Sequence, residues 1–204
     1  MAAILDHFAL TDVTLIGVSL GGCLVVRAAA FEPRVRRVVA YDVLFDFVDA
    51  ALHARAPSVR VVARSLLALR AGWVLDALIH RLAARDLLMR WAVAQGMHVL
   101  GVESPYRFLR RAQAFQTRDV SHRVTQDVLL LAGSADHYVP LHQLPRQMMA
   151  LTNARSVTTR VFTRAEQAQN HCQIGNVGLA VQVILGWLGS VSLPAARGEI
   201  PDGL

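Results

Sequence analysis

The chain has 204 residues, of which 54% are hydrophobic and 18% are charged, and its formal net charge is +6. This composition excludes an intrinsically disordered chain, a collagen-like repeat and an acidic tail, and it predicts a packed globular protein. Every basic residue is an arginine. Because these arginines are dispersed and not interleaved with aromatic residues, a solvated helix surface is a better interpretation than a nucleic-acid or anionic-membrane partner.

The two cysteines, Cys23 and Cys172, allow at most one disulfide and match no metal-ligand spacing. We therefore expect a reducing compartment, no metal and no cofactor. The N-terminus has no basic region and meets an acid at Asp6, so we expect a cytoplasmic protein without a secretory signal. The uncharged stretch from Ile174 to Ala196 nominally reaches membrane-spanning length, but its polar residues, its glycines and Pro194 favour a buried helix over a membrane span.

The N-terminal part of the chain predicts a short helix, a strand, a second helix and a second strand. These elements are expected near residues 4–10, 13–18, 23–31 and 35–41, and the last ends at Asp42. The run at 13–18 is apolar at both even and odd positions, as expected of a parallel strand covered on both faces. The order of these elements is therefore strand, sharp turn, helix, strand.

Strand patterns are absent from residues 43–120, where alanine, leucine and arginine dominate. The arginine spacing predicts several short amphipathic helices with their arginines facing solvent. One helix should begin with Ser104 as its N-cap and Pro105 at its first position, and run through about Gln116. Such a long helical insertion exceeds an ordinary connection, so we predict a cap over a site. Side chains expected to shape an apolar pocket there are Trp73, Met89, Trp91, Met97, Tyr106 and Phe108.

The C-terminal part returns to alternating strands and helices. Strands are expected at 128–133 and 156–162, helices at 141–151 and about 176–188, and a frayed tail with proline and glycine at the end. This alternation predicts an α/β fold with a mostly parallel sheet of about four strands. The core would comprise residues 1–42 and 121–204, interrupted by the helical cap at 43–120.

Residues Gly17 to Gly21 match the pattern Gly-x-Ser-x-Gly where a buried strand meets a helix. Glycines two positions before and after Ser19 would let strand and helix approach closely around a strained turn. That turn directs the Ser19 hydroxyl outward at the carboxyl end of the strand, above a helix N-terminus that favours a developing negative charge. We interpret Ser19 as a nucleophile, with a serine in an ordinary glycine-rich turn as the alternative.

A serine nucleophile needs a base, and the base needs an orienting carboxylate. Asp136 is the candidate acid because it follows the strand that ends at Gly133, which places it in the loop at the strand's carboxyl end. A turn aspartate that caps the next helix is the alternative interpretation. Asp119 and Asp127 are weaker candidates because they precede that strand.

His171 is the candidate base because it lies after the last predicted strand and before the last predicted helix. The other seven histidines suit surface or packing roles better, and a metal pair of His137 and His142 would lack further ligands. Cys23, one helical turn beyond Ser19, and Cys172, beside His171, border the expected site. A small buried apolar role is favoured for both cysteines.

Three segments resemble the nucleophile elbow, the acid loop and the histidine loop of the α/β-hydrolase superfamily. They are Gly17–Gly22, Ala132–Pro140 and Ala168–Gln173. Within that superfamily the chain is similar to capped serine hydrolases of the dipeptidyl aminopeptidase and acylaminoacyl-peptidase type, and to 2,6-dihydropseudooxynicotine hydrolase. The resemblance implies a Ser19–His171–Asp136 triad, an acyl-enzyme and an oxyanion donor at the Leu20 backbone N–H. The substrate would be a small-molecule or peptide-like carbonyl compound, such as an ester or amide.

The resemblance also implies a core with further strands ahead of the elbow strand, so that this chain supplies only the C-terminal half of the core. The elbow strand would then have an apolar edge that invites pairing with a second copy of the chain. The oxyanion donor from an earlier loop would be missing. Two interpretations stay open: a serine hydrolase, or a truncated, non-catalytic hydrolase fragment that needs a partner or the missing N-terminal segment.

Overall fold

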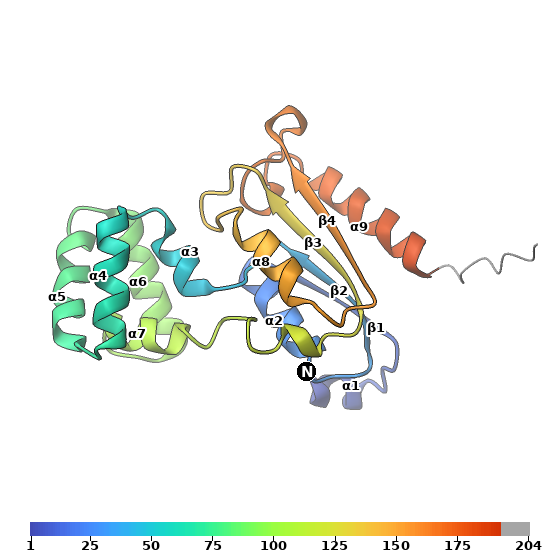
Figure 1. Cartoon of the computed structure of the whole chain (residues 1–204), viewed down its shortest axis with the longest axis horizontal. Coiled ribbons are helices and arrows are strands. Elements are labelled where there is room, and N and C mark those ends of the chain that lie inside the picture. Colours follow the sequence, from blue (N-terminus) through green and yellow to red (C-terminus); the bar gives the residue numbers. More distant parts are fainter. Residues whose placement is uncertain (193–204) are drawn as a thin grey trace, which may run out of the picture.

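The computed structural model describes residues 1–192, and the expected frayed tail falls largely beyond them. Four parallel strands form one sheet in the order β1-β2-β3-β4 (Figure 1). Their bounds are Val13–Val18, Val35–Tyr41, Asp127–Gly133 and Ser156–Phe162. The predicted α/β fold with about four mostly parallel strands is therefore confirmed, and all four strands are parallel.

Burial differs strongly along the sheet. Every residue of β3 is buried, because strands pair with it on both sides and helices cover it on both faces. β1 pairs only with β2 among the described residues, and its side chains Ile16 and Val18 are 49% and 50% exposed. The expected apolar edge at the elbow strand is therefore present.

Helices cover the sheet on both faces. On one face, α2 (Leu20–Ala29) and α8 (Gln143–Ala150) pack on a core that includes Val26, Val38 and Leu130. On the other, α9 (Val177–Ser192) packs on residues such as Phe162 through Ala180, Ile184 and Trp187. The remaining helical segments of the core are α1 (Ala2–His7) and the single 3₁₀ turns η1 (Ser121–Arg123), η2 (Arg164–Glu166) and η3 (His171–Gln173).

The predicted helix ends differ from the observed ones by a few residues. α1 ends at His7 instead of Leu10, and α2 begins directly after Ser19 instead of at Cys23. α9 continues past Leu188 to Ser192. Among residues 1–192, no single helix is long and apolar enough to cross a bilayer. Two consecutive segments, Arg164–Gln173 and Val177–Val191, reach the required length and hydropathy when they are taken together, but the chain bends by 83° between them.

Helices α3 to α7 form a helical lobe beside the sheet (Figure 1). Their bounds are Phe47–His53, Pro57–Ala68, Gly72–Ala83, Leu87–Leu100 and Pro105–Ala112, all within the predicted insertion. The lobe has its own apolar interior, which includes Leu67, Leu75 and Phe108. It is thus a separate packing unit and not an extension of the sheet's core.

The start of α7 agrees with the sequence prediction, but its end does not. Ser104 accepts the Arg107 N–H and Pro105 occupies the first turn, as expected. The helix stops at Ala112, short of the predicted Gln116, because the chain turns back toward the core. There Gln116 pairs with Asp46 in an isolated antiparallel bridge.

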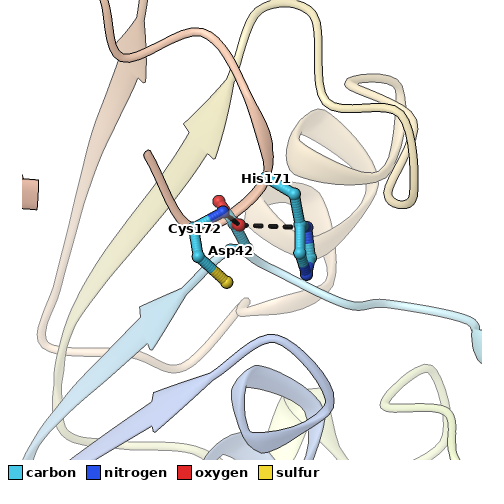
Figure 2. A group of neighbouring side chains, drawn as sticks. All are labelled: Asp42, His171 and Cys172. Carbon is cyan, nitrogen blue, oxygen red and sulfur yellow. Dashed lines mark hydrogen bonds and ion pairs between the residues drawn. The ribbon is translucent and has the colours of Figure 1, made fainter. Parts of the chain in front are cut away.

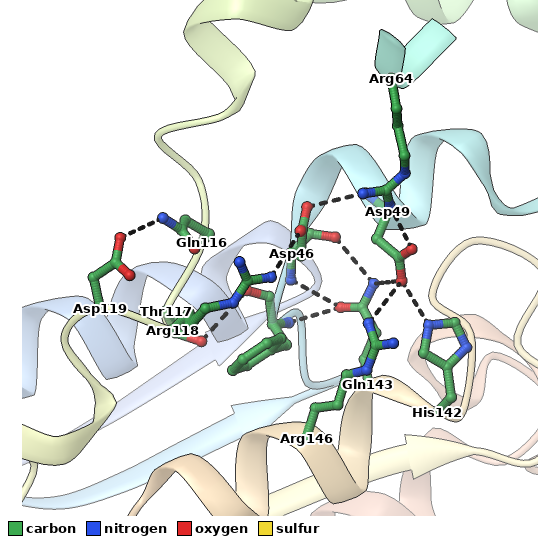
Figure 3. Close-up of polar contacts among 11 residues, drawn as sticks. Asp46, Asp49, Arg64, Gln116, Thr117, Arg118, Asp119, His142, Gln143 and Arg146 are labelled. Atoms are coloured by element: carbon green, nitrogen blue, oxygen red, sulfur yellow. Dashed lines mark hydrogen bonds and ion pairs between the residues drawn. The ribbon is translucent and has the colours of Figure 1, made fainter. Parts of the chain in front are cut away.

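Polar contacts around Gln143 join the lobe to the core (Figure 3). The buried side-chain oxygen of Gln143 accepts the N–H groups of Phe45 and Asp46 at 2.8 and 3.0 Å. Asp49, on α3, lies 2.6 Å from His142 Nε2 and accepts a hydrogen bond from Arg64 at 2.7 Å. These contacts fix the first lobe helix against the start of α8.

Candidate active site

Ser19 lies in a strained turn between β1 and α2. Its φ of 56° and ψ of −117° are rare for a residue with a side chain. A Cβ on Gly17 would collide with the backbone of Gly21, so the expectation of a close approach at Gly17 is right. A Cβ on Gly21 would meet open space, so the same expectation for Gly21 is wrong. Gly22 is the second position without room, because its Cβ would collide with the carbonyl oxygen of Asp42.

The structure brings the three predicted residues together from three distant segments. His171 Nε2 lies 2.9 Å from Ser19 Oγ, and His171 Nδ1 lies 2.7 Å from Asp136 Oδ2. One imidazole nitrogen therefore faces the hydroxyl and the other faces a carboxylate. An imidazole in this position can take a proton from the hydroxyl while the carboxylate orients the ring.

Asp136 faces the candidate base and also holds its own loop, but it does not cap the next helix, whose N-cap is His142. Its Oδ2 faces His171, while its Oδ1 accepts the N–H groups of Tyr138 and Val139 at 2.7 and 2.9 Å. Burial alone would raise the pKa of this carboxyl, but the hydrogen bonds from His171 and the two N–H groups outweigh burial and lower the pKa. The turn contacts thus hold the carboxylate ionised and aimed at the imidazole.

The surroundings of His171 favour its protonated form. Burial lowers the pKa of the imidazole, but Asp136, through its hydrogen bond and charge, and the neighbouring Cys172 side chain more than offset that effect and raise the pKa above its usual 6.5. The imidazolium is the form that results when a histidine takes the proton of a serine. The site therefore stabilises the charge that such a transfer creates.

Asp42, at the end of β2, is a second carboxylate at His171 that the sequence interpretation did not single out. Its Oδ2 lies 3.1 Å from His171 Nδ1, and its side chain is completely buried (Figure 2). Burial raises the pKa of Asp42. One signal was available in the sequence: Asp42 directly follows a predicted strand, and the carboxyl ends of parallel strands meet at one edge of a sheet.

Three side chains near Ser19 carry atoms that could bind a metal ion. The donor atoms of Asp42, His171 and Cys172 lie within 4.8 Å of one another. The Asp42 carboxylate already accepts hydrogen bonds from Cys172 N–H and the Gln173 amide, and His171 Nδ1 faces Asp136. A metal would have to displace these partners, so we assign none to this group.

The apolar surroundings of Ser19 differ from the predicted pocket. A cluster formed by Cys23, Leu44 and Val139, with Phe47 and Phe115 packed against it, adjoins the turn through Leu20. Burial raises the pKa of the Cys23 thiol to about 12, which agrees with its expected role as a small apolar side chain. The six side chains expected to shape the pocket lie elsewhere: Met89, Met97, Tyr106 and Phe108 pack in the lobe interior, and Trp73 and Trp91 are 81% and 60% exposed.

Leu20 is the first residue of α2, so its backbone N–H belongs to the helix turn whose donors lack partners within the helix. This N–H follows directly after Ser19, at the positive end of the helix dipole. His142, which the sequence did not favour as a metal ligand, faces Asp49. His137 instead stacks against Tyr138, with its ring 6.3 Å from that of His171.

Comparisons with known proteins agree with this architecture, although no family model matches the chain. "Hydrolase ORFZ" of Pyricularia oryzae is 30% identical over 175 residues, which are 81% of this chain and 39% of that protein. The chain therefore spans less than half the length of this curated relative.

Two solved structures share the fold. One is the 2,6-dihydroxy-pseudo-oxynicotine hydrolase, 18% identical, with a TM-score of 0.59 over 93% of this chain and 44% of that chain. The other is the α/β hydrolase GrgF from Penicillium sp. sh18, 15% identical, with a TM-score of 0.60 over 93% of this chain and 69% of that chain. The chain is thus similar in sequence to a curated hydrolase and shares the fold of these two α/β hydrolases.

Proposed function

We propose that the chain carries the machinery of a serine hydrolase that cleaves an ester, an amide or a related carbonyl compound through an acyl-enzyme. The observation that carries this proposal is the continuous line of contacts from Ser19 Oγ to His171 Nε2 and from His171 Nδ1 to Asp136, at 2.9 and 2.7 Å. Relatives named as hydrolases support the same class of reaction.

In the proposed reaction, Ser19 Oγ attacks the substrate carbonyl while His171 Nε2 takes its proton. Asp136 keeps Nδ1 protonated and stabilises the imidazolium, and the Leu20 N–H donates to the carbonyl oxygen as it becomes negative. His171 then gives its proton to the leaving group. In the second half, His171 takes a proton from water, the resulting hydroxide attacks the acyl carbon, and Ser19 Oγ leaves with the proton returned by His171.

The apolar cluster that adjoins Ser19 through Leu20 supports the proposed substrate class. Leu20, Leu44, Phe47, Phe115 and Val139 are apolar and come from both the core and the segments that enter and leave the lobe. They suit an apolar acyl or leaving group on a small molecule. The lobe would act as a cap, and the two free thiols suit a reaction in the cytoplasm.

A fluorophosphonate probe tests this proposal, because it forms a stable bond only with an activated serine. We expect the wild-type chain to be labelled at Ser19 and the Ser19→Ala variant to lose labelling completely. Ser104→Ala, which removes a helix cap in the lobe, is the matched control and should label normally. A folded wild-type chain that takes up no probe would refute the proposal.

The exposed edge of β1 supports a second candidate function. Ile16 and Val18 are half exposed on a strand that has one neighbour in the described sheet. The second candidate is a fragment that is non-catalytic on its own and pairs with a second polypeptide at this edge. Such a chain would fold by itself but would not be labelled by the probe. Labelling that arises only when the chain is part of an oligomer or a mixed complex would favour this candidate.

A further inference from the structure

The end of β2 holds the loop that carries the candidate base. The Tyr41 hydroxyl donates to the Cys172 carbonyl at 3.0 Å. The Asp42 carboxylate accepts the Cys172 N–H and, at 2.9 Å, the side-chain amide of Gln173. Three hydrogen bonds therefore join two consecutive residues of β2 and its exit to the two residues that follow His171.

The same segment also supports the nucleophile turn. The Tyr41 carbonyl accepts the Ser19 N–H at 2.8 Å. Because Gly22 has no side chain, α2 packs directly against the carbonyl oxygen of Asp42. The exit of β2 is thus in contact with both segments that bring Ser19 and His171 together.

The structure keeps this arrangement although it is unfavourable locally. Asp42, Cys172 and Gln173 have φ values of 60°, 51° and 46°, which residues with side chains rarely adopt. The Asp42 side chain is also completely buried, which disfavours its charged form. Strained residues and buried charges persist where surrounding contacts fix them, and they concentrate at functional sites.

We propose that Asp42 is a positioning residue of the hydrolase proposed above, on which this inference rests: it fixes the His171 loop and presents a second carboxylate to Nδ1. Nδ1 carries one hydrogen and faces two carboxylates. Asp136, at 2.7 Å, is its hydrogen-bond partner, and Asp42, at 3.1 Å, is an ion-pair partner. The second carboxylate keeps the ring oriented when the first is lost.

Several other titratable groups face the imidazole and define what the test must separate. They are the Ser19 hydroxyl, the Cys172 thiol, the Tyr138 ring at 5.0 Å and the His137 ring at 6.3 Å. The two carboxylates are the acidic groups nearest to Nδ1. An acidic neighbour favours the imidazolium, so removing either one should lower the pKa of His171.

The deciding experiment measures the pKa of His171 by NMR titration of its ring nitrogens in the full chain. Asp42→Asn should lower this pKa by about one pH unit. Asp127→Asn is the matched control, because it removes a buried carboxylate that is paired with Arg155 at the opposite end of the sheet. It should leave the pKa of His171 unchanged. A wild-type value in Asp42→Asn overturns the proposal.

A second variant keeps the proposal testable if Asp42→Asn does not fold. In Asp136→Asn the remaining Asp42 should hold the pKa of His171 above 6.5, and a value at or below 6.5 overturns its role. Where both single variants fold, the double variant should label with the fluorophosphonate at least tenfold more slowly than the product of the single effects predicts. Effects that simply multiply contradict a role for Asp42 as a second carboxylate partner of His171.

The two proposals fail in different ways. A folded wild-type chain without fluorophosphonate labelling refutes the hydrolase, whatever the titration gives. A labelled wild-type chain whose His171 pKa ignores Asp42→Asn refutes only the role of Asp42. The titration needs no turnover, so the two outcomes remain separable.

Discussion

The site end of the sheet and the helical lobe are stabilised in contrasting ways. At the site, polar contacts join residues far apart in the chain: Ser19 and His171 are 152 positions apart, and Asp42 and Cys172 are 130 apart. The lobe comes from one continuous stretch and is held by an apolar interior of its own. The geometry of the site therefore depends on the whole core, whereas the lobe can be altered with little effect on the three candidate residues.

The largest effect on labelling is expected from Asp136→Asn, which changes only the site end of the sheet. An asparagine amide can donate to Nδ1 and so favour the wrong imidazole tautomer, which should slow fluorophosphonate labelling by roughly 10⁴-fold. Thermal unfolding should show that the variant is folded. Asp119→Asn, which neutralises the carboxylate that accepts a hydrogen bond from Gln116, is the control and should label at the wild-type rate. A normal rate in Asp136→Asn would exclude its role as the acid.

A pair of cavity variants separates core from lobe. Leu130 in β3 and Leu75 in α5 are both fully buried, so each change to alanine should lower the free energy of unfolding by about 2–5 kcal/mol in a urea titration. Leu130→Ala should also slow labelling, while Leu75→Ala should leave the labelling rate of the folded chain near normal. Leu69→Ala, at a position 77% exposed, should change neither. Equal slowing in both cavity variants would contradict independence of the two regions.

The stability that the junction between core and lobe contributes should depend on pH. Burial alone would raise the pKa of Asp49, but His142, Arg64 and Arg146 more than offset this and lower it. A lowered native pKa means that the stabilisation is complete above the unfolded pKa of about 4 and is lost as the pH falls through the native pKa.

Asp49→Asn should therefore lower the unfolding temperature at pH 7 by about 2–4 °C, and the difference should shrink as the pH falls toward 2. Calorimetry at several pH values provides the measurement. Asp12→Asn is the control, because it removes an exposed ion pair with Arg37 and should change the unfolding temperature less. A loss that is equal at pH 2 and pH 7 would show that charge is not what Asp49 contributes.

The smallest effect on stability concerns the edge of β1. Ile16→Lys should change the free energy of unfolding by less than about 0.5 kcal/mol, because the side chain is already half exposed. It should nevertheless reduce self-association in sedimentation velocity, since a charge on an edge strand opposes pairing. Thr159→Lys on β4, the opposite edge, should leave association unchanged. A wild-type chain that sediments as a monomer would contradict self-pairing.

The positions of Ser19, Asp136 and His171 could be predicted because each follows a strand with a distinct pattern. Parallel strands place their carboxyl ends at one edge, so three such loops must converge there. The strand bounds were predictable to within one residue for the same reason: the apolar runs at Val13–Val18 and Asp127–Gly133 are sharply delimited.

Other features arise only from tertiary packing. Asp42 looks like any aspartate that ends a strand, and its burial and positive φ come from loops more than a hundred residues later. Helical periodicity identified apolar side chains in the lobe, but it could not say which partner each would meet. Hence Trp91 was expected in the pocket and is exposed, while Phe47 and Phe115 were missed and pack beside Leu20.

The contacts of Tyr41 and Asp42 have a mechanical consequence for the proposed enzyme. Ser19 is tied to Tyr41, Asp42 is tied to Cys172, and His171 returns to Ser19, so the contacts form a closed linkage. The three segments in this linkage are the Ser19 turn, the end of β2 and the His171 loop. If one of these three segments moves, hydrogen bonds to the other two must break, so the reacting groups are kept in place by one another and not by the lobe.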